Sequence, residues 1–185
     1  MKVERASIAD VLVLEPKVFG DARGFFYESY NRRTFAQDTG VETDFVQDNH
    51  SRSAKGVLRG LHYQLRQPQG KLIRVTAGEI WDVAVDLRRS SASFGRSTGT
   101  RLAAASPRLL WIPPGFAHGF LVLSEQAEVQ YKTTDFYAPE HERILLWNDP
   151  ALAIRWPLSG QPGGEPVMTD KDRRGKPLAE AETFA

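Results

Sequence analysis

The chain has no cysteine among its 185 residues, which excludes disulfide bonds, thiolate metal sites and cysteine nucleophiles. It also has no excess of either charge, because 24 Lys and Arg residues face 23 Asp and Glu residues. Without a block of like charge, a nucleic-acid backbone is a poor partner, although a few local cations suffice for the phosphates of a nucleotide. No apolar run is long enough to span a bilayer, and residues 1–5 lack the apolar core of a signal peptide. We therefore expect a soluble, cytoplasmic protein that binds neither nucleic acid nor membrane.

β-Branched and aromatic residues are concentrated in short runs separated by Gly, Pro and Ser. These runs predict strands at residues 57–64, 72–87 with a break at Gly78, 109–112, 119–123 and 127–133. A short helix is expected at 31–39, with Asn31 as its N-cap. Many short strands with turns between them are typical of a β-sandwich or barrel, and a jelly roll fits the length. We expect one all-β domain over residues 1–185, with its core at about 11–157 and a C-terminal tail, 158–185, that contributes to the functional site and contains one or two helical turns.

The segment 56–64, GVLRGLHYQ, places a histidine on an expected strand, and Lys71 follows shortly after it. Histidine can take a proton near neutral pH, arginine binds phosphate, and lysine can stabilise a developing oxyanion. A regular strand would send His62 and Arg59 to opposite faces. Gly60 between them permits a bulge that would bring both side chains into one cavity. These residue types predict proton abstraction next to a carbonyl, on a substrate that carries phosphate.

A second segment, PPGFAHGF at 113–120, delivers His118 from a Pro-Gly turn onto a strand. It resembles the second sequence motif of the cupin jelly rolls, whose metal-binding members use this histidine together with an H-x-H pair and a glutamate. Here residues 62–64 offer one histidine, without a second or an obvious glutamate, so a metal-free cupin is favoured. Asp82 and Asp86 share a strand face at a spacing that suits solvent exposure or an orienting role. We expect Asp82 to orient a ring nitrogen of His118.

Two groups of aromatic residues allow a structural or a functional interpretation. Three successive aromatics at 25–27 cannot all face one core, so at least one is available to an interface or to a ligand base, and an edge strand exchanged between subunits would explain them. Tyr131 on the strand 127–133 is either a core tyrosine or a phenol that donates a proton opposite a base.

Many ordered stretches make the chain similar to the dTDP-4-dehydrorhamnose 3,5-epimerase family, from about residue 11 to the tail. They are GDARGFFYES at 20–29, QDNHS at 47–51, residues 56–64, QGKLIRV at 69–75, GEIWDVAVDLR at 78–88, residues 113–120, YKTT at 131–134, WNDP at 147–150 and DKD at 170–172. The resemblance implies a cofactor-independent cupin-type jelly roll that forms a homodimer with exchanged N-terminal strands.

The resemblance also implies catalytic roles for four residues. His62 would be the base that removes the protons at C3 and C5, both next to the C4 ketone of a dTDP-4-keto-6-deoxyhexose. Asp172 would orient His62, Lys71 would stabilise the enolate oxygen, and Tyr131 would return a proton from the opposite face of the sugar. No redox cofactor is implied, which fits the lack of a Gly-rich dinucleotide loop in the sequence.

A larger set of positions is implied to bind the substrate. The diphosphate would be contacted by Arg23, Arg59 and Lys171. The nucleotide or the sugar would be contacted by Glu28, Gln47 and Asn49, together with Asp48 from the same motif. Phe26 and Tyr137 would stack on the thymine, His118 would contact the sugar, and Glu142 would contact the nucleoside end.

The residues leave several alternatives open. Sister enzymes of the same shape epimerise only C3 or only C5, and related cupins catalyse 3,4-ketoisomerisation. A non-catalytic sugar-nucleotide binding module would need no acid opposite the base, so Tyr131 and Asp172 weigh against it. A metal-dependent cupin oxygenase would require stoichiometric iron or manganese for activity.

Overall fold

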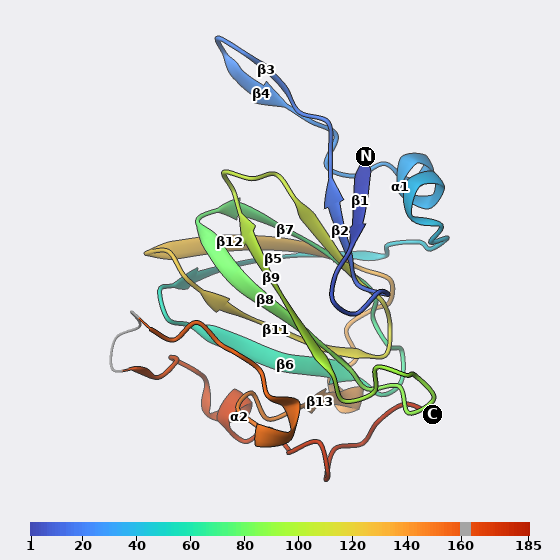
Figure 1. Ribbon diagram of the computed structural model, residues 1–185, viewed down its shortest axis with the longest axis vertical. Helices are drawn as coiled ribbons and strands as arrows, with labels where there is room; N and C mark the ends of the chain where they lie inside the picture. The colour runs from blue at the N-terminus through green and yellow to red at the C-terminus, as the bar shows by residue number, and fades with distance from the viewer. Residues whose placement is uncertain (160–163) are drawn as a thin grey trace.

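The computed structural model describes residues 1–159 and 164–185. Two antiparallel sheets face each other as a jelly-roll sandwich, and a separate hairpin extends from it (Figure 1). The first sheet has the order β1 (Lys2–Arg5), β2 (Leu12–Glu15), β10 (Leu109–Ile112), β7 (Lys71–Ala77), β12 (Gln126–Thr133) and β5 (Gln47–Ala54). The second has the order β13 (Glu142–Ile144), β6 (Leu58–Gln64), β11 (Phe116–Val122), β8 (Glu79–Asp86) and β9 (Ser97–Ala103). The all-β prediction is confirmed.

The main core lies between the two sheets, and β8 shows how the sequence builds it. Successive side chains of a strand point to opposite faces. Ile80 and Ala84 accordingly join the cluster between the sheets, whereas Val83 and Val85 join a second cluster on the outer face of the five-stranded sheet. The alternation in residues 80–87 therefore separates two buried faces, rather than one buried face from one exposed face.

The outer faces of both sheets are covered by segments from outside them. Helix α1 (Arg32–Thr39) packs Phe35 against Trp111 and neighbouring leucines of the six-stranded sheet. Its predicted N-cap is confirmed, because the Asn31 side chain accepts hydrogen bonds from the backbone of the first turn. The C-terminal tail covers the five-stranded sheet and adds Leu178, Ala181 and Phe184 to the outer cluster. The tail contains a single short helix among the described residues, α2 (Asp170–Arg173).

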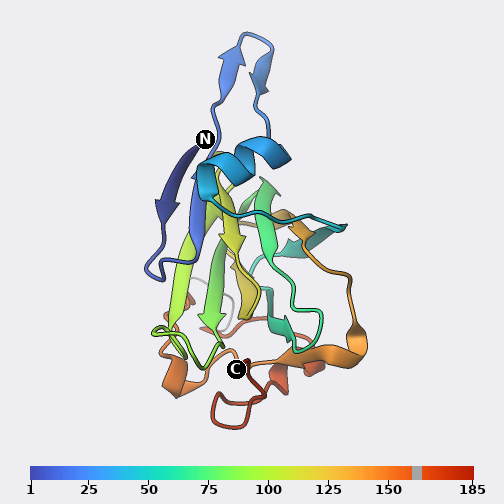
Figure 2. The same cartoon turned by 90° about the vertical axis from the view of Figure 1, so that its right-hand side faces the viewer.

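The N-terminal aromatic run forms the hairpin of β3 (Phe19–Asp21) and β4 (Gly24–Phe26). The hairpin projects beyond the sandwich in both views (Figures 1 and 2). Phe25 and Phe26 are 71% and 70% exposed. Apolar exposure of this size on a projecting element is typical of an interaction surface.

Some elements differ from the sequence-based expectation. Strands β1, β2, β5, β9 and β13 were not predicted. Strand β5 in particular, QDNHSRSA, has almost no apolar residue because it lines a polar cavity on one side and carries charged groups on the other. Asp82 and Asp86 are both fully buried, so solvent exposure is the wrong interpretation of that pair. The expected tail 158–185 includes residues 160–163, which lie outside the described residues. No helix in the described part of the chain is long and apolar enough to cross a membrane.

Candidate active site

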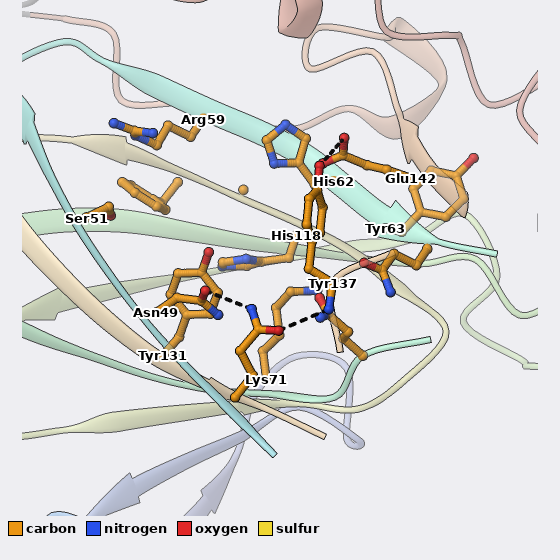
Figure 3. Close-up of a pocket in the computed structure, with 15 residues that line it drawn as sticks. Asn49, Ser51, Arg59, His62, Tyr63, Lys71, His118, Tyr131, Tyr137 and Glu142 are labelled. Atoms are coloured by element: carbon orange, nitrogen blue, oxygen red, sulfur yellow. Dashed lines mark hydrogen bonds between the residues drawn. The ribbon is translucent and has the colours of Figure 1, made fainter. Parts of the chain in front are cut away.

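A cavity of about 310 Å³ opens between the two sheets (Figure 3). We call it the central cavity. Its lining side chains come from both sheets and from the loops that join them: Gln47, Asn49, Ser51, Arg59, His62, Tyr63, Gln64, Gln69, Lys71, His118, Gly119, Phe120, Tyr131, Tyr137 and Glu142. Nine of the predicted site residues therefore lie together in one place.

Arg59 and His62 both line the central cavity, although three positions separate them on β6. The register of β6 against β11 shifts between them, so the strand contains the predicted bulge. Gly60 has a φ of +115°, and a Cβ on it would lie 2.6 Å from the His118 carbonyl oxygen. Opposite it, a Cβ on Gly119 would lie 2.5 Å from the Arg59 carbonyl oxygen. Two glycines facing each other thus allow the close approach of backbones that aims both side chains inward.

His62 is held by a carboxylate from the C-terminal tail. Its Nε2 lies 2.7 Å from Oδ1 of Asp172, which leaves Nδ1 as the basic nitrogen when Nε2–H donates. The Asp172 carboxylate is buried on α2, whose N-cap Thr169 accepts from the Asp172 backbone. Burial alone would raise the pKa of Asp172, but the hydrogen bonds from His62 and Thr169 and the charge of His62 together lower it. The carboxylate therefore stays ionised and can stabilise an imidazolium.

Lys71 begins β7 on the opposite sheet, and it is only 7% exposed. Burial lowers the pKa of its ammonium to about 8, against the raising influence of the charges on Asp82 and Glu142. A lysine of this kind remains protonated near neutral pH, yet it is poorly solvated. It can therefore stabilise a nearby negative charge more strongly than an exposed lysine could.

Tyr131 on β12 faces His62 from the other sheet, and Figure 3 shows the two side chains on different sides of the cavity. Burial is the main reason that the pKa of Tyr131 is raised, so its hydroxyl keeps its proton. A neutral phenol across a cavity from a histidine base is placed to donate a proton from the opposite side.

His118 lines the cavity and pairs with Asp82, which is not among the lining residues. Its Nε2 lies 2.8 Å from Asp82 Oδ2, as predicted, and both side chains are buried. The other oxygen of Asp82, Oδ1, is buried without a hydrogen-bond partner among the described residues. The Asp82 carboxylate orients the imidazole ring, and its charge raises the pKa of Lys71.

Most of the predicted binding residues surround the same cavity. Arg59 Nε donates to Ser53 Oγ over 2.9 Å, which leaves the rest of the guanidinium free to reach the cavity. Gln47 Nε2 donates to Asn49 Oδ1 over 2.9 Å, and Tyr137 donates its hydroxyl to Glu142 Oε2 over 3.3 Å. Lys171 does not line the cavity itself, but its ammonium forms an ion pair with Glu142 at the rim.

Four predicted binding residues lie away from the central cavity of this chain. Arg23 and Phe26 are on the projecting hairpin, where Arg23 pairs with Asp21. Glu28 is exposed and accepts from Asn31 Nδ2. Asp48 alternates with its inward-facing neighbours, so it points to the outer face of the sheet and accepts from Lys132 Nζ.

Several cavity residues were not singled out by the sequence analysis: Ser51, Tyr63, Gln64, Gln69, Gly119 and Phe120. Gln64 could have been found from strand alternation, because it follows His62 by two positions on β6. Ser51 carries no such signal, since β5 has no apolar pattern from which a face can be assigned. Within residues 1–159 and 164–185 no group of three or more His, Asp or Glu side chains could hold a metal ion.

The fold and the cavity define the class of protein: a cupin-like jelly roll whose histidine, lysine and tyrosine are equipped to move protons next to a carbonyl, as an isomerase requires. The profile of the family described as dTDP-4-dehydrorhamnose 3,5-epimerase matches residues 5–180. The chain belongs to this family.

Individual relatives agree with that assignment. The dTDP-4-dehydrorhamnose 3,5-epimerase of Pseudomonas aeruginosa is 61% identical over 184 residues, covering 100% of this chain and 99% of that protein. The crystal structure of dTDP-6-deoxy-D-glucose-3,5-epimerase from Legionella pneumophila, in complex with dTDP-4-keto-L-rhamnose, is 47% identical with a TM-score of 0.93, covering 98% of this chain and 94% of that one. A 3'-monoepimerase from Streptomyces bikiniensis, in complex with dTDP-quinovose, is 31% identical with a TM-score of 0.86, covering 95% of this chain and 87% of that one.

Proposed function

We propose that this protein epimerises dTDP-4-dehydro-6-deoxy-D-glucose at C3 and C5 to dTDP-4-dehydro-L-rhamnose, a step in dTDP-L-rhamnose biosynthesis. The observation that carries the proposal is the placement of a carboxylate-held histidine and a protonated tyrosine on facing sheets, with a buried lysine in the same cavity. Inversion of a carbon next to a ketone needs a base on one side, an acid on the other, and a cation for the enolate oxygen.

The proposed reaction has two equivalent halves. His62 removes the proton at C3, the electron pair moves toward C4, and the ketone oxygen becomes an enolate beside the Lys71 ammonium. Tyr131 then protonates C3 from the opposite face, and the electron pair returns to restore the ketone. His62 then releases the proton it took to solvent, and Tyr131 takes one up from solvent, after which the same sequence occurs at C5. The oxidation state of the sugar does not change, so the balanced reaction requires no redox cofactor.

Substrate binding is assigned to the residues around the cavity rim. Arg59 and Lys171 supply positive charge for the diphosphate. Gln47 and Asn49 contact the nucleotide or the sugar, and His118 contacts the sugar. Tyr137 stacks on the thymine, and Glu142 contacts the nucleoside end.

We further propose a homodimer in which each subunit lends its β3–β4 hairpin to the partner. Its apolar residues are exposed, and Arg23 and Phe26 on it lie away from the central cavity of their own chain. Exchange of the hairpin would bring both residues, and with them Glu28, to the cavity of the second copy. Mixing His62→Ala chains with Arg23→Ala chains tests this arrangement. Hybrid dimers should regain activity, because one of their two cavities has both residues intact; no recovery after subunit exchange would refute it.

The location of the enzyme follows from its substrate. A nucleoside diphosphate sugar is charged and does not cross a bilayer unaided, so the enzyme must share a compartment with the enzyme that produces the substrate. We propose the cytoplasm, which cell fractionation with an antibody to this chain can test.

The likeness to a 3'-monoepimerase supports one alternative, epimerisation at a single carbon. Proton NMR of dTDP-4-keto-6-deoxy-D-glucose incubated with the protein in deuterated water separates the two. Loss of signal at both C3 and C5, with formation of dTDP-L-rhamnose after a coupled reductase is added, would support the 3,5-epimerase. Exchange at one carbon would support the alternative, and no exchange at either would refute both.

A further inference from the structure

The segment 135–138, which follows β12, is fastened to the body of the protein by the side chains of glutamines. It presents Tyr137 at the mouth of the central cavity, where the residue is 52% exposed. A backbone stretch next to a ligand site and without regular secondary structure would ordinarily be mobile. Four side-chain amides bond to it: Gln47 accepts from the Tyr137 backbone, Gln64 bonds to Phe136 and Ala138, and Gln67 and Gln69 donate to Asp135.

Gln64 differs from the other three because it is buried and bonds on both sides of Tyr137. The residue is only 4% exposed. Its Nε2 donates to the Phe136 carbonyl over 3.2 Å, and its Oε1 accepts from the Ala138 amide over 3.0 Å. The peptide groups on either side of Tyr137 are therefore fixed by one side chain. The direction of the Tyr137 Cα–Cβ bond, from which the ring extends, is fixed with them.

Hydrogen bonds to the backbone occupy both N–H groups of the Gln64 side chain. Besides the Phe136 carbonyl, Nε2 donates to the Gln67 carbonyl over 2.8 Å, so both of its N–H groups are engaged by backbone. Gln64 lies two residues after His62 and lines the cavity, but it has no N–H left to offer a sugar or a phosphate. Its contribution to binding is therefore made through the residue that it holds.

We infer that Gln64 is a positioning residue for nucleotide recognition: it holds Tyr137 in place for stacking before the substrate arrives. This inference rests on the proposed function, which assigns Tyr137 to the thymine. Stacking of a base on an aromatic side chain contributes more to affinity when the ring is already ordered before binding, because no conformational entropy is then lost on binding. The far end of the ring is also fixed, by the hydrogen bond from its hydroxyl to Glu142 (Figure 3).

The test is a double-mutant cycle between Gln64→Met and Tyr137→Ala, read by titration calorimetry with dTDP and with inorganic pyrophosphate. Gln64→Met keeps the volume of the side chain and removes its hydrogen bonds. We expect each single variant to weaken dTDP binding by roughly 5- to 140-fold, the range for loss of one stacked base. The double variant should bind dTDP no more weakly than Tyr137→Ala alone, and pyrophosphate binding should stay within twofold of wild type in every variant.

Steady-state kinetics provide the second readout. Gln64→Met should raise KM for the sugar nucleotide while kcat stays within about threefold of wild type, because the base and acid are untouched. A matched control is Gln67→Asn, which removes an exposed hydrogen bond to the same segment and suits the positive φ of 51° at that position. It should leave the affinity for dTDP unchanged. If Gln64→Met does not fold, Gln64→Glu retains the acceptor for Ala138 without the donors and enters the same cycle.

Three results would overturn the inference: additive losses of dTDP affinity in the double variant, a loss of kcat with unchanged affinity for dTDP, or full dTDP affinity in Tyr137→Ala. The deuterium-exchange assay on the wild-type protein is independent of these measurements. A protein that shows the coupling between Gln64 and Tyr137 but exchanges no sugar proton would refute the proposed reaction and leave the nucleotide site in place.

Discussion

Replacing Lys71 by methionine should make the protein more stable and almost inactive at the same time. Burial lowers the pKa of the ammonium from its ordinary 10.5 to about 8, a difference of about 2.5 units. At about 1.36 kcal/mol for each unit, the charged lysine destabilises the fold by about 3 kcal/mol at neutral pH. Methionine has a similar length and carries no charge to desolvate, so the variant should recover most of this free energy.

The stability of the wild-type protein should depend on pH in a definite direction. Between about pH 8 and pH 10.5 the unfolded chain holds a proton on Lys71 that the folded chain has released, so the wild-type protein gains stability as the pH rises through this window. Methionine lacks this dependence. The advantage of the variant should therefore be largest below pH 8 and should disappear by about pH 10.5.

Urea unfolding at several pH values measures the effect, at a fixed protein concentration because the stability of the proposed dimer would depend on concentration. The melting temperature should rise by roughly 6–12 °C near pH 7 for a chain of this length. Turnover should fall about 10²- to 10³-fold, as when one oxyanion donor is removed. A variant that is less stable than wild type at pH 7 would refute the reasoning, because it would mean that Asp82 and Glu142 outweigh the burial of Lys71.

Four further predictions concern the same cavity. His62→Ala should abolish turnover and retain dTDP binding in a calorimetric titration, and turnover near the wild-type rate would remove the base assignment. Tyr131→Phe should keep deuterium exchange at the sugar carbons while losing net inversion, whereas a parallel decline of both would contradict proton return from the opposite face. Wild-type kcat/KM should fall as the pH rises through about 8, where Lys71 of the free protein loses its proton, and a flat profile up to pH 10 would exclude a role for that charge. Asp82→Asn should move this alkaline limb to lower pH, because the charge on Asp82 raises the pKa of Lys71, and should lower the rate by releasing His118; an unchanged profile and rate would disprove both roles.

The sequence predicted the parts of this fold that local chemistry determines. The N-cap at Asn31, the break at Gly78 and the strand at 109–112 follow from the properties of the residues themselves. The bulge at Gly60 was identifiable because only an added residue could bring Arg59 and His62 to one face. The strand β5 was not predictable in this way, because its polar side chains are paired with partners distant in sequence.

The contacts of the candidate site also include some that the sequence does not reveal. The family resemblance named Asp172, but no spacing in the sequence reveals that a residue 110 positions away bonds to His62. That contact depends on how the tail crosses the outer face of the five-stranded sheet. The hydrogen bonds from Gln64 to Phe136 and Ala138 could not be predicted either, because they are made to backbone groups of a segment without a periodic pattern.

The position of Asp172 in the tail separates the loss of activity from the loss of structure. Helix α2 has only four residues and is too short to be stable alone. It remains in place because Leu178, Ala181 and Phe184 pack against the sheet. Local opening of this tail exposes far less apolar surface than unfolding of the sandwich, so it requires less free energy. On warming, His62 should lose its contact with Asp172 while the amides of the two sheets stay protected from hydrogen exchange. The enzyme then passes through a state in which the sandwich is folded but catalysis has stopped.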